Sequence, residues 1–329
     1  MKNVGIIGSG SWGTAIASVL ANNGHKVVLW SYLKEEYEMF LKYNEHTKFL
    51  PGVKLPGNVS YTNDIKAAVE GMDIIVVACP SFAIRSTAEK IKPYYDNQII
   101  VSIAKGLEDE SLKCLSEVIK EVIEPKKEVC VLCGPSHAEE VGKKMATTLV
   151  AASEDEKIAK EIQDTFMCDY LRVYTSDDVI GVQLGGALKN VISLCVGISD
   201  GLGYGDNIKA ALMTRGMAEI IRLGTKMGGK IETFSGLTGM GDLIVTCTSM
   251  HSRNRRAGIL IGQGKTPDEA KKEVGMVVEG MLACRSAYEL SKKYDVEMPI
   301  VNEAYGVLYL DYDVNQSMMN LMLRDKKAE

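Results

Sequence analysis

The sequence lacks an excess of positive charge. Its 43 acidic residues outnumber its 38 lysines and arginines, so the formal net charge is −5. Proteins that attract nucleic acid or anionic membranes by their overall charge have the opposite balance. This composition therefore excludes both as main partners, and an anionic ligand would have to be met by a local cluster of basic side chains.

Long uncharged apolar runs are also missing, and none approaches the roughly 18 residues that a membrane-spanning helix needs. We therefore expect no membrane insertion. The first residues, MKNVGIIGSGSWG, run directly into an apolar string and a glycine turn, so we expect no signal peptide. The eight cysteines are scattered along the chain. Without an export signal we expect them to be reduced and the protein to be cytoplasmic.

Two of these cysteines, Cys130 and Cys133, form a C-x-x-C pair inside the apolar string EVCVLCG. If this string is a strand, residues three apart point to opposite faces of the sheet. The pair then cannot share a metal ion, and we predict no metal site.

The first half of the chain alternates short β-rich strings with helical patterns, which is typical of βαβ units and a mostly parallel sheet. We predict an α/β, Rossmann-type domain over residues 1–178. The predicted strands are Val4–Ile7, Lys26–Trp30, Asp73–Ala78, Gln98–Ile103, Val129–Cys133, Thr147–Ala152 and Tyr170–Val173. The predicted helices are Ala15–Asn22, Ala83–Lys92, Ser111–Glu124 and Glu156–Phe166.

After about residue 178 the strand signal fades, and the chain shows helical patterns broken by glycine-rich segments that we expect to be loops. We predict an all-helical second domain over residues 179–329. Beyond the long apolar pattern that starts near residue 179, the predicted helices are Ile208–Met227, Arg255–Gln263, Pro267–Val274, Gly280–Tyr294 and Pro299–Tyr309.

A glycine motif, G-x-G-x-x-G, stands between the first predicted strand and the first helix. Gly8 permits the tight turn, Gly10 lets the backbone approach a pyrophosphate, and Gly13 lets the helix pack closely on the strand. The helix that begins near Ser11 would direct free N–H groups and its positive dipole end at the phosphates. In this position the motif predicts a dinucleotide site.

The acid that usually follows the second strand of an NAD site is missing. Ser31 and Tyr32 occupy the decisive positions, and Lys34 lies just beyond them. An NAD site usually has Asp or Glu here, and an NADP site often has Arg. The sequence leaves the choice between NAD and NADP open.

Two lysines stand where a ligand would be expected. Lys189 lies in GGALKNVISL among small and apolar residues, and lysine is seldom buried without a partner. Lys105 follows a predicted strand, and open α/β sheets bind ligands at the carboxyl ends of their strands. Ser136 and His137 follow another strand end, where we expect a helix to open near Ser136 and to be capped by it; a structural role is favoured for His137.

Residues 234–258 combine glycines, an acid and a basic cluster. Three glycines precede Asp242, and Ser252, Arg253 and Asn254 follow later in the segment. An arginine fork with hydroxyl and amide neighbours suits a phosphate group. Arg255 and Arg256 are interpreted as the solvated start of a helix.

Taken in order, the motifs resemble those of bacterial NAD(P)-dependent glycerol-3-phosphate dehydrogenases. The resemblance covers nearly the whole chain, from residue 8 to residue 280, and several ordered motifs are more specific than the glycine loop alone. The motifs are GSGSWGTA, AKGLE, CGPSHAEE, GALKN, GLTGMGDL, SRNRR and VVEG.

This resemblance implies a Rossmann domain followed by a helical domain, and it implies roles for individual residues. Lys189 matches the catalytic lysine, the general acid or base on the C2 oxygen of dihydroxyacetone phosphate or glycerol 3-phosphate. The implied substrate contacts are Lys105, Gly134, Ser136, Lys189, Asp242, Ser252, Arg253 and Asn254. The implied cofactor contacts are Ser11, Trp12, Lys105, Ala138, Arg253, Val277 and Glu279, beside the glycines and the Ser31–Tyr32 pair already named.

The chain departs from the family pattern at two points. The family usually has an aromatic residue where His137 stands, and many members have a basic residue near Tyr32. The expected role is reduction of dihydroxyacetone phosphate for phospholipid synthesis. Two alternatives stay open: a β-hydroxyacid or 6-phosphogluconate type of dehydrogenase, and a non-catalytic protein that senses NAD(P)H. A homodimer is equally left open.

Overall fold

The computed structural model describes residues 1–326, and the chain divides into two compact units. The first comprises residues 1–108 and 113–183, and the second comprises residues 109–112 and the chain from 184 onward. The division falls inside helix α7 (Val179–Gly201), a little beyond residue 178, where the predicted boundary lies.

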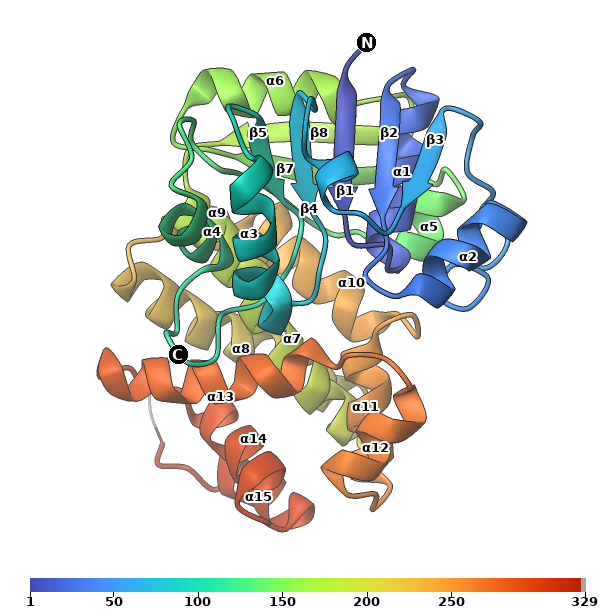
Figure 1. Cartoon of the computed structure of the whole chain (residues 1–329). Coiled ribbons are helices and arrows are strands. Elements are labelled where there is room, and N and C mark those ends of the chain that lie inside the picture. The colour runs from blue at the N-terminus through green and yellow to red at the C-terminus, as the bar shows by residue number, and fades with distance from the viewer. Residues whose placement is uncertain (327–329) are drawn as a thin grey trace. The chain divides into compact units, whose positions relative to one another are not determined.

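The first unit is built on an eight-stranded sheet with the order β3-β2-β1-β4-β5-β6-β7-β8 (Figure 1). The strands are β1 (Asn3–Ile7), β2 (Lys26–Trp30), β3 (Val59–Thr62), β4 (Ile74–Val77), β5 (Ile99–Ser102), β6 (Cys130–Cys133), β7 (Thr147–Ala152) and β8 (Leu171–Ser176). Every pair is parallel except β6 with β7. The predicted fold class, a mostly parallel α/β sheet followed by helices, is confirmed.

Helices cover both faces of this sheet, because its central strands are apolar on both sides. Ile6 of β1 packs in one core, which contains side chains of α1 and α6, whereas its neighbour Ile7 packs in another, which contains side chains of α3 and α4. The helices of this unit are α1 (Ser11–Asn22), α2 (Lys34–Tyr43), α3 (Ile84–Ile91), α4 (Leu115–Ile123), α5 (Ala138–Gly142) and α6 (Glu156–Phe166), with short 3₁₀ turns η1 (Lys66–Ala68), η2 (Ser81–Ala83) and η3 (Lys92–Tyr94).

Two differences between the sequence prediction and this unit concern strand β3 and the start of helix α4. Strand β3 was not predicted, because its four residues lie at the sheet edge and only the first is fully buried. Helix α4 begins at Leu115 rather than Ser111, because Leu107 and Cys114 form an antiparallel bridge. The backbone N–H of Cys114 donates to the Glu117 carboxylate at 2.8 Å, which closes the N-terminus of the helix there.

Strand β1 lies between β2 and β4, and the parallel register aligns the carboxyl ends of all three strands. Ile7 pairs with Trp30 of β2 on one side and with Val77 of β4 on the other. The chain continues from β1 to β2 on one side and later returns to β4 on the other side. At such a reversal of strand order a crevice forms at the carboxyl ends of the strands, which is where open α/β sheets bind ligands. The glycine turn after β1 therefore lies at the ligand-binding edge.

The second unit, in its described part, is helical. Its helices are the main part of α7, then α8 (Asp206–Lys226), α9 (Ile231–Ser235), the π-helical turn η4 (Leu237–Gly241), α10 (Asp242–Thr248), α11 (Arg253–Gly262), α12 (Pro267–Val274), α13 (Glu279–Lys293), α14 (Pro299–Tyr309) and α15 (Val314–Met322). The glycine-rich segment expected to be a loop is helical from α9 through α10. Glycine is required inside this tight coil, because a Cβ on Gly239 would lie 2.0 Å from the carbonyl oxygen of Phe234.

Helix α7 corrects the expectation that no segment approaches the length of a membrane span. By length and composition alone it could cross a membrane, but 94% of its most apolar 18-residue window is buried inside the protein. The apolar residues of α7 therefore form a core, and the helix is a buried element of the second unit along most of its length.

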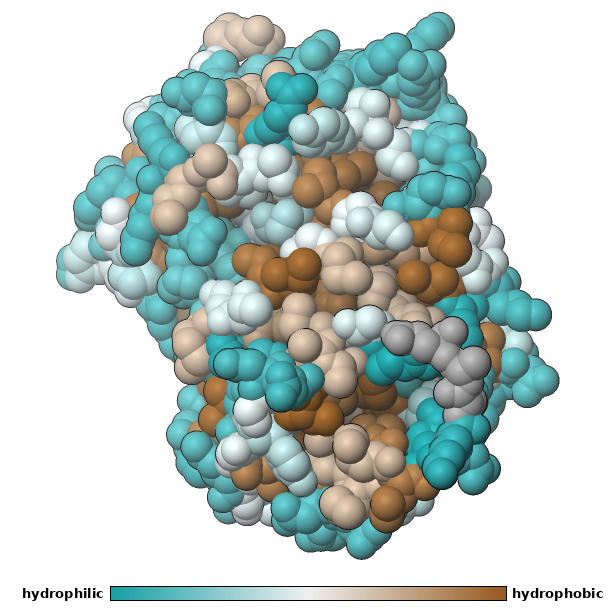
Figure 2. Space-filling view, turned by 180° about the vertical axis from the view of Figure 1, so that it is seen from behind, coloured by the Kyte–Doolittle hydropathy of each residue, from teal (hydrophilic) through white to brown (hydrophobic). Residues whose placement is uncertain are grey.

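The surface mixes residue types. Figure 2 shows hydrophilic and apolar residues side by side on one face of the protein. The exposed large apolar side chains include Leu310, Met319 and Met322 around α14 and α15. More than half of the accessible surface of folded proteins is apolar, so these side chains by themselves do not indicate a partner.

One buried carboxylate stands out in the second unit. Glu219 on α8 accepts hydrogen bonds from the backbone N–H groups of Ile300 at 2.8 Å and Val301 at 3.2 Å. These are unpaired donors of the first turn of α14, so the carboxylate caps that helix. Burial raises the pKa of Glu219 to about 7, although the two backbone hydrogen bonds act in the opposite direction.

This pKa predicts a pH-dependent stability. The pKa of Glu219 in the folded state lies above its unfolded value of 4.5. Glu219 therefore contributes fully to the free energy of unfolding below about pH 4.5, and this contribution is lost as the pH rises to about 7. The loss amounts to about 3 kcal/mol in the free energy of unfolding. In Glu219→Gln this part of the pH dependence should disappear, as measured by urea unfolding between pH 4.5 and 8. The exposed Glu232→Gln is the control, and an identical pH profile for Glu219→Gln and wild type would contradict the assignment.

Candidate active site and cofactor site

Lys189 is buried and paired. Its side chain is only 5% exposed, and its Nζ donates to Oδ1 of Asp242 at 2.7 Å and to Oγ1 of Thr246 at 2.5 Å. The Thr246 hydroxyl in turn donates to the backbone carbonyl of Asp242 at 2.6 Å. Lys189, for which the sequence predicted a ligand or a partner, is thus held by an acid and a hydroxyl that lie one helical turn apart on α10.

Residues spaced four apart form a stripe along one face of α7. This face contacts η4, α10 and α11. Residues with this spacing lie above one another on one side of a helix. The glycines in the stripe mark close contacts, since a Cβ on Gly185 would lie 2.7 Å from the carbonyl oxygen of Thr238. The stripe consists of Gly185, Lys189, Ser193, Gly197 and Gly201.

The same stripe meets helix α11. A Cβ on Gly197 would lie 2.1 Å from the carbonyl oxygen of Arg255, and one on Gly201 would lie 2.2 Å from that of Ile259. These two glycines let the backbones of α7 and α11 approach closely. The first residues of α11, which carry the predicted phosphate contacts, are therefore held against the helix that carries Lys189.

Ser193 and Asn190 tie the predicted SRN segment to α7. Ser193 Oγ donates to the carbonyl of Thr246 at 2.9 Å and lies 3.1 Å from Ser252 Oγ. The Asn254 side chain donates to Asn190 Oδ1 at 2.9 Å and accepts from the N–H of Gly280 at 2.8 Å. The buried network therefore has two parts: one joins Lys189, Asp242 and Ser252 through Thr246 and Ser193, and the other joins Asn254 to α7 through Asn190.

Sequence reasoning missed three members of this network: Asn190, Ser193 and Thr246. The spacing could have indicated them, because Ser193 and Thr246 each follow a predicted site residue by four positions, which is one helical turn. Asn190 directly follows Lys189. The sequence did not show which helices face each other, and without that information these three residues could not be assigned.

The basic cluster at the start of α11 has two kinds of arginine. Arg253 is the first residue of the helix, and Ser252 caps it by accepting from the N–H of Arg255 at 3.2 Å. Arg255 was interpreted as a solvated side chain, and this was wrong: its guanidinium pairs with Asp200 at 2.7 Å and donates to the carbonyl of Thr248 at 2.7 Å. Arg256 also departs from that interpretation, because its Nε is buried.

The glycine loop of the first unit has the shape that a dinucleotide needs. Gly8 has a φ of +124°, which L side chains rarely adopt, and a Cβ on Gly13 would lie 2.0 Å from the carbonyl oxygen of Gly8. A Cβ on Gly10, by contrast, would meet nothing within 4 Å, so its backbone is open to a ligand. No side chain caps α1, which begins at Ser11, so its first N–H groups are available to a pyrophosphate.

Two buried polar atoms at this edge have no hydrogen-bond partner among the described residues: the indole Nε1 of Trp12 and the hydroxyl of Ser31. Buried donors without partners are rare in folded proteins. Both residues are predicted cofactor contacts. Together with the open Gly10 backbone, they make this edge fit a dinucleotide.

Lys105 and its predicted neighbours form a second group in the first unit. The Nζ of Lys105 donates to the carbonyl of Gly134 at 2.9 Å, and Ser136 Oγ donates to the same carbonyl at 3.0 Å. The expected cap is corrected here: α5 begins at Ala138, and His137 rather than Ser136 is its N-cap residue. Gly134 has a φ of +151°, and a Cβ there would lie 2.9 Å from the carbonyl oxygen of Thr148.

The cysteines offer little chemistry. Cys130 and Cys133 are both buried in β6. Burial raises the pKa of Cys130 to about 12, and it raises that of Cys247 on α10 to about 12 although Lys189 acts in the opposite direction. At neutral pH these two thiols are protonated and are therefore poor nucleophiles.

The remaining predicted contacts, Val277 and Glu279, lie at the start of α13, where Glu279 is its first residue.

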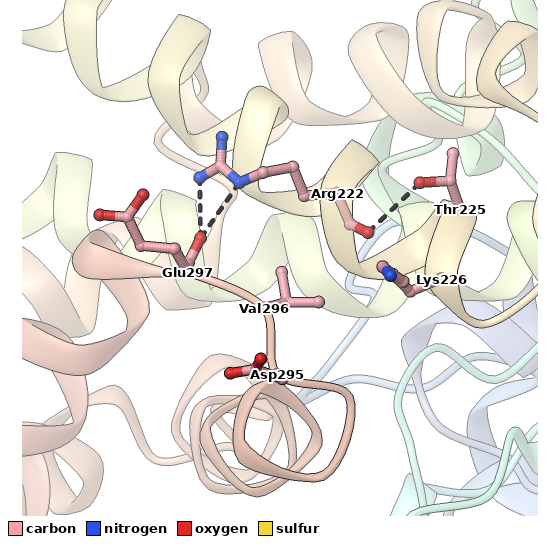
Figure 3. A pocket seen from close by; sticks show the side chains of 6 residues that line it. All are labelled: Arg222, Thr225, Lys226, Asp295, Val296 and Glu297. Atoms are coloured by element: carbon pink, nitrogen blue, oxygen red, sulfur yellow. Dashed lines mark hydrogen bonds between the residues drawn. The ribbon is translucent and has the colours of Figure 1, made fainter. Parts of the chain in front are cut away.

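A separate pocket of about 330 Å³ opens elsewhere in the second unit (Figure 3). The Arg222 guanidinium spans it and donates twice to the backbone carbonyl of Glu297, at 3.1 and 2.9 Å. This pocket shares no residue with the predicted site; it is lined by Arg222, Thr225, Lys226, Asp295, Val296 and Glu297.

Two family models match the chain. Residues 3–159 match the model of the NAD-dependent glycerol-3-phosphate dehydrogenase N-terminus, and residues 178–319 match that of the C-terminus. The chain belongs to the NAD-dependent glycerol-3-phosphate dehydrogenase family. It is an NAD(P)-dependent oxidoreductase, as predicted, and membership decides against the β-hydroxyacid and 6-phosphogluconate alternative.

Individual relatives agree along the whole length. The chain is 55% identical over 330 residues to the glycerol-3-phosphate dehydrogenase [NAD(P)+] of Agathobacter rectalis, covering all of this chain and 98% of the relative. A crystal structure of the enzyme from Coxiella burnetii is similar with a TM-score of 0.95 and 37% identity, covering 98% of this chain and 99% of that one. A yeast glycerol-3-phosphate dehydrogenase structure is similar with a TM-score of 0.83 and 29% identity, covering 96% and 98%.

The glycines of the family's dinucleotide loop allow a matched pair of variants. Gly13→Ala should lower the melting temperature by several degrees, because its Cβ meets a backbone oxygen that cannot move aside. Gly10→Ala should melt like wild type but bind NADH at least tenfold more weakly, because its methyl group occupies the approach to the pyrophosphate. Thermal denaturation and NADH fluorescence titration measure the two effects. Equal melting temperatures for both variants would contradict the close approach at Gly13.

Proposed function

We propose that the chain catalyses the reversible reduction of dihydroxyacetone phosphate to glycerol 3-phosphate, with Lys189 as the general acid in this direction and the general base in reverse. The observation that carries this proposal is the buried contact of Lys189 with Asp242 and Thr246. An ammonium group in such a place would be costly without partners; Asp242 and Thr246 are its partners, and proton transfer is the function that we assign to it.

Reduction of a ketone places negative charge on its oxygen, and a positioned proton donor lowers that barrier. The bound nicotinamide supplies the hydride in this reaction. Lys189 would donate its proton to the C2 oxygen of the substrate and would take it back in the oxidation. Asp242 and Thr246 accept two of the three N–H groups of Lys189 and so restrict the direction of the ammonium.

The phosphate of the substrate would be bound by the start of α11. Arg253 supplies the guanidinium at the first helical position. Ser252 and Asn254 are proposed to complete the contact, and the buried network that holds them would fix the distance between phosphate and C2. Lys105, Gly134 and Ser136 remain proposed substrate contacts on the strength of the family resemblance.

We further propose that residues 1–178 bind the cofactor and residues 179–329 bind the substrate and carry the catalytic lysine. The cofactor contacts proposed are the glycine loop with Ser11 and Trp12, followed by Ser31, Tyr32, Lys105, Ala138, Arg253, Val277 and Glu279. The chain would act in a reducing compartment, the cytoplasm, where scattered cysteines remain thiols. There the product would supply phospholipid synthesis.

Replacement of the lysine tests the catalytic assignment. Lys189→Ala should lower kcat by at least a thousandfold and leave the Kd of NADH within about twofold, because a proton donor is lost while the glycine loop is intact. Initial rates of NADH oxidation with dihydroxyacetone phosphate and a fluorescence titration measure both quantities. Because the change leaves Asp242 buried without its partner, Lys189→Met and the double variant Lys189→Met/Asp242→Asn serve as folded controls. A turnover near wild type in any of the three would refute the role.

Replacement of the phosphate arginine tests the substrate assignment. Arg253→Ala should raise the KM for dihydroxyacetone phosphate by ten- to a hundredfold, because a charge-assisted contact to phosphate is lost. The neighbouring Arg255→Ala is the matched comparison: it should lower the melting temperature through the loss of its ion pair with Asp200 and change the KM much less. An unchanged KM in Arg253→Ala would place the phosphate elsewhere.

A further inference from the structure

The end of strand β2 has no carboxylate to bind a ribose 2′-hydroxyl. Ser31 follows the strand directly, and its hydroxyl is buried with no hydrogen-bond partner among residues 1–326. Tyr32 comes next and is 68% exposed. In dinucleotide-binding folds this strand end distinguishes the 2′-hydroxyl of NAD from the 2′-phosphate of NADP. Nothing at Ser31 or Tyr32 would repel a phosphate.

Glu36 is the acid nearest to Ser31 in the sequence whose side chain is held in place, and it already has partners. Its carboxylate accepts a hydrogen bond from Ser9 Oγ in the glycine loop at 2.8 Å and lies 3.7 Å from Nε2 of His46. The nearby His46 and the hydrogen bond from Ser9 lower the pKa of Glu36, although burial opposes them. Glu36 therefore stabilises the β2–α2 connection and is not available to a ribose.

A cation reaches the same place from another helix. Lys90, on α3, is exposed, and its Nζ lies 4.6 Å from the ring centroid of Tyr32. A lysine over an aromatic face is attracted by the ring. This contact holds a positive charge above the side chain that follows Ser31. Lys34, at the start of α2, adds a second cation nearby in sequence, and it pairs with Glu38 at 3.7 Å.

We propose that Lys90 binds the 2′-phosphate of NADP(H) above the Tyr32 ring, so that the chain accepts NADP(H) without a basic residue at the end of β2. An ammonium is a recognised partner of phosphate, though as a point charge rather than a fork. The inference deepens the proposed function by naming the cofactor form, and it rests on that function only for the reaction, since binding can be measured separately.

Calorimetric titration of the full-length chain tests the proposal with four ligands: NADP+, NAD+, adenosine 2′,5′-bisphosphate and adenosine 5′-monophosphate. The last two differ only by the 2′-phosphate. Lys90→Met should weaken NADP+ and the bisphosphate about tenfold, which corresponds to the loss of one charged contact. It should leave NAD+ and the monophosphate within twofold of wild type.

Three further variants make the assignment specific. Lys92→Met, which removes an exposed cation paired with Glu124, should leave all four affinities unchanged. Lys90→Arg should retain the affinity for the bisphosphate. Glu35→Gln, at an exposed acid on α2, should leave NAD+ unchanged; a loss of NAD+ affinity there would mean that Glu35 binds the ribose hydroxyl and would overturn the proposal. Equal weakening of all four ligands in Lys90→Met would do the same.

The two proposals fail in different ways. If wild type oxidises NADH or NADPH with dihydroxyacetone phosphate but Lys90→Met binds the bisphosphate like wild type, the inference fails and the proposed function stands. If Lys90→Met discriminates as expected but no ketone-dependent oxidation occurs with either nucleotide, the inference stands and the proposed function fails.

Discussion

The buried pairing of Lys189 with Asp242 is the interaction on which the second unit depends. Removing two charges from water costs several kcal/mol for each ion, and their attraction compensates only when the geometry is good and further hydrogen bonds are present. Thr246 supplies one of those bonds, and the close contact of Gly185 with the backbone of Thr238 sets the distance between α7 and the start of α10. The lysine that we propose as catalytic is thus also part of the contact that constrains α7 and α10.

Backbone contacts made possible by glycine occur at both of the proposed ligand sites. In the first unit they shape the turn between β1 and α1, where Gly13 lies against the carbonyl of Gly8. In the second unit they bring α11 against α7 through Gly197 and Gly201. In both places the absence of a side chain lets two backbone segments pack directly against each other. This close packing fixes the distances between the polar groups that the two segments carry. The high glycine content, 31 residues, follows in part from this use.

The end of β2, which we propose to bind the 2′-phosphate, is built differently from the rest of the proposed site. At the glycine loop and at Lys189 the functional groups come from short, continuous motifs. At the end of β2 the local residues are neutral, and the charge comes from α3 through the contact of Lys90 with Tyr32. A family resemblance based on motifs cannot show such a residue, because nothing in the sequence around Lys90 marks it.

The sequence by itself determined the alternation of strands and helices, the position of the glycine turn after the first strand and the expectation that Lys189 has a partner or a function. Each of these depends on local spacing or on one charge among apolar neighbours. Only the tertiary structure decided the partners: Thr246 for Lys189, Ser193 for Ser252, Asp200 for Arg255 and Lys90 for Tyr32. It also decided that Leu237–Gly241 coil into a π-helical turn rather than a loop. The reason is physical: these contacts join residues dozens of positions apart, and helix packing sets the distances between them.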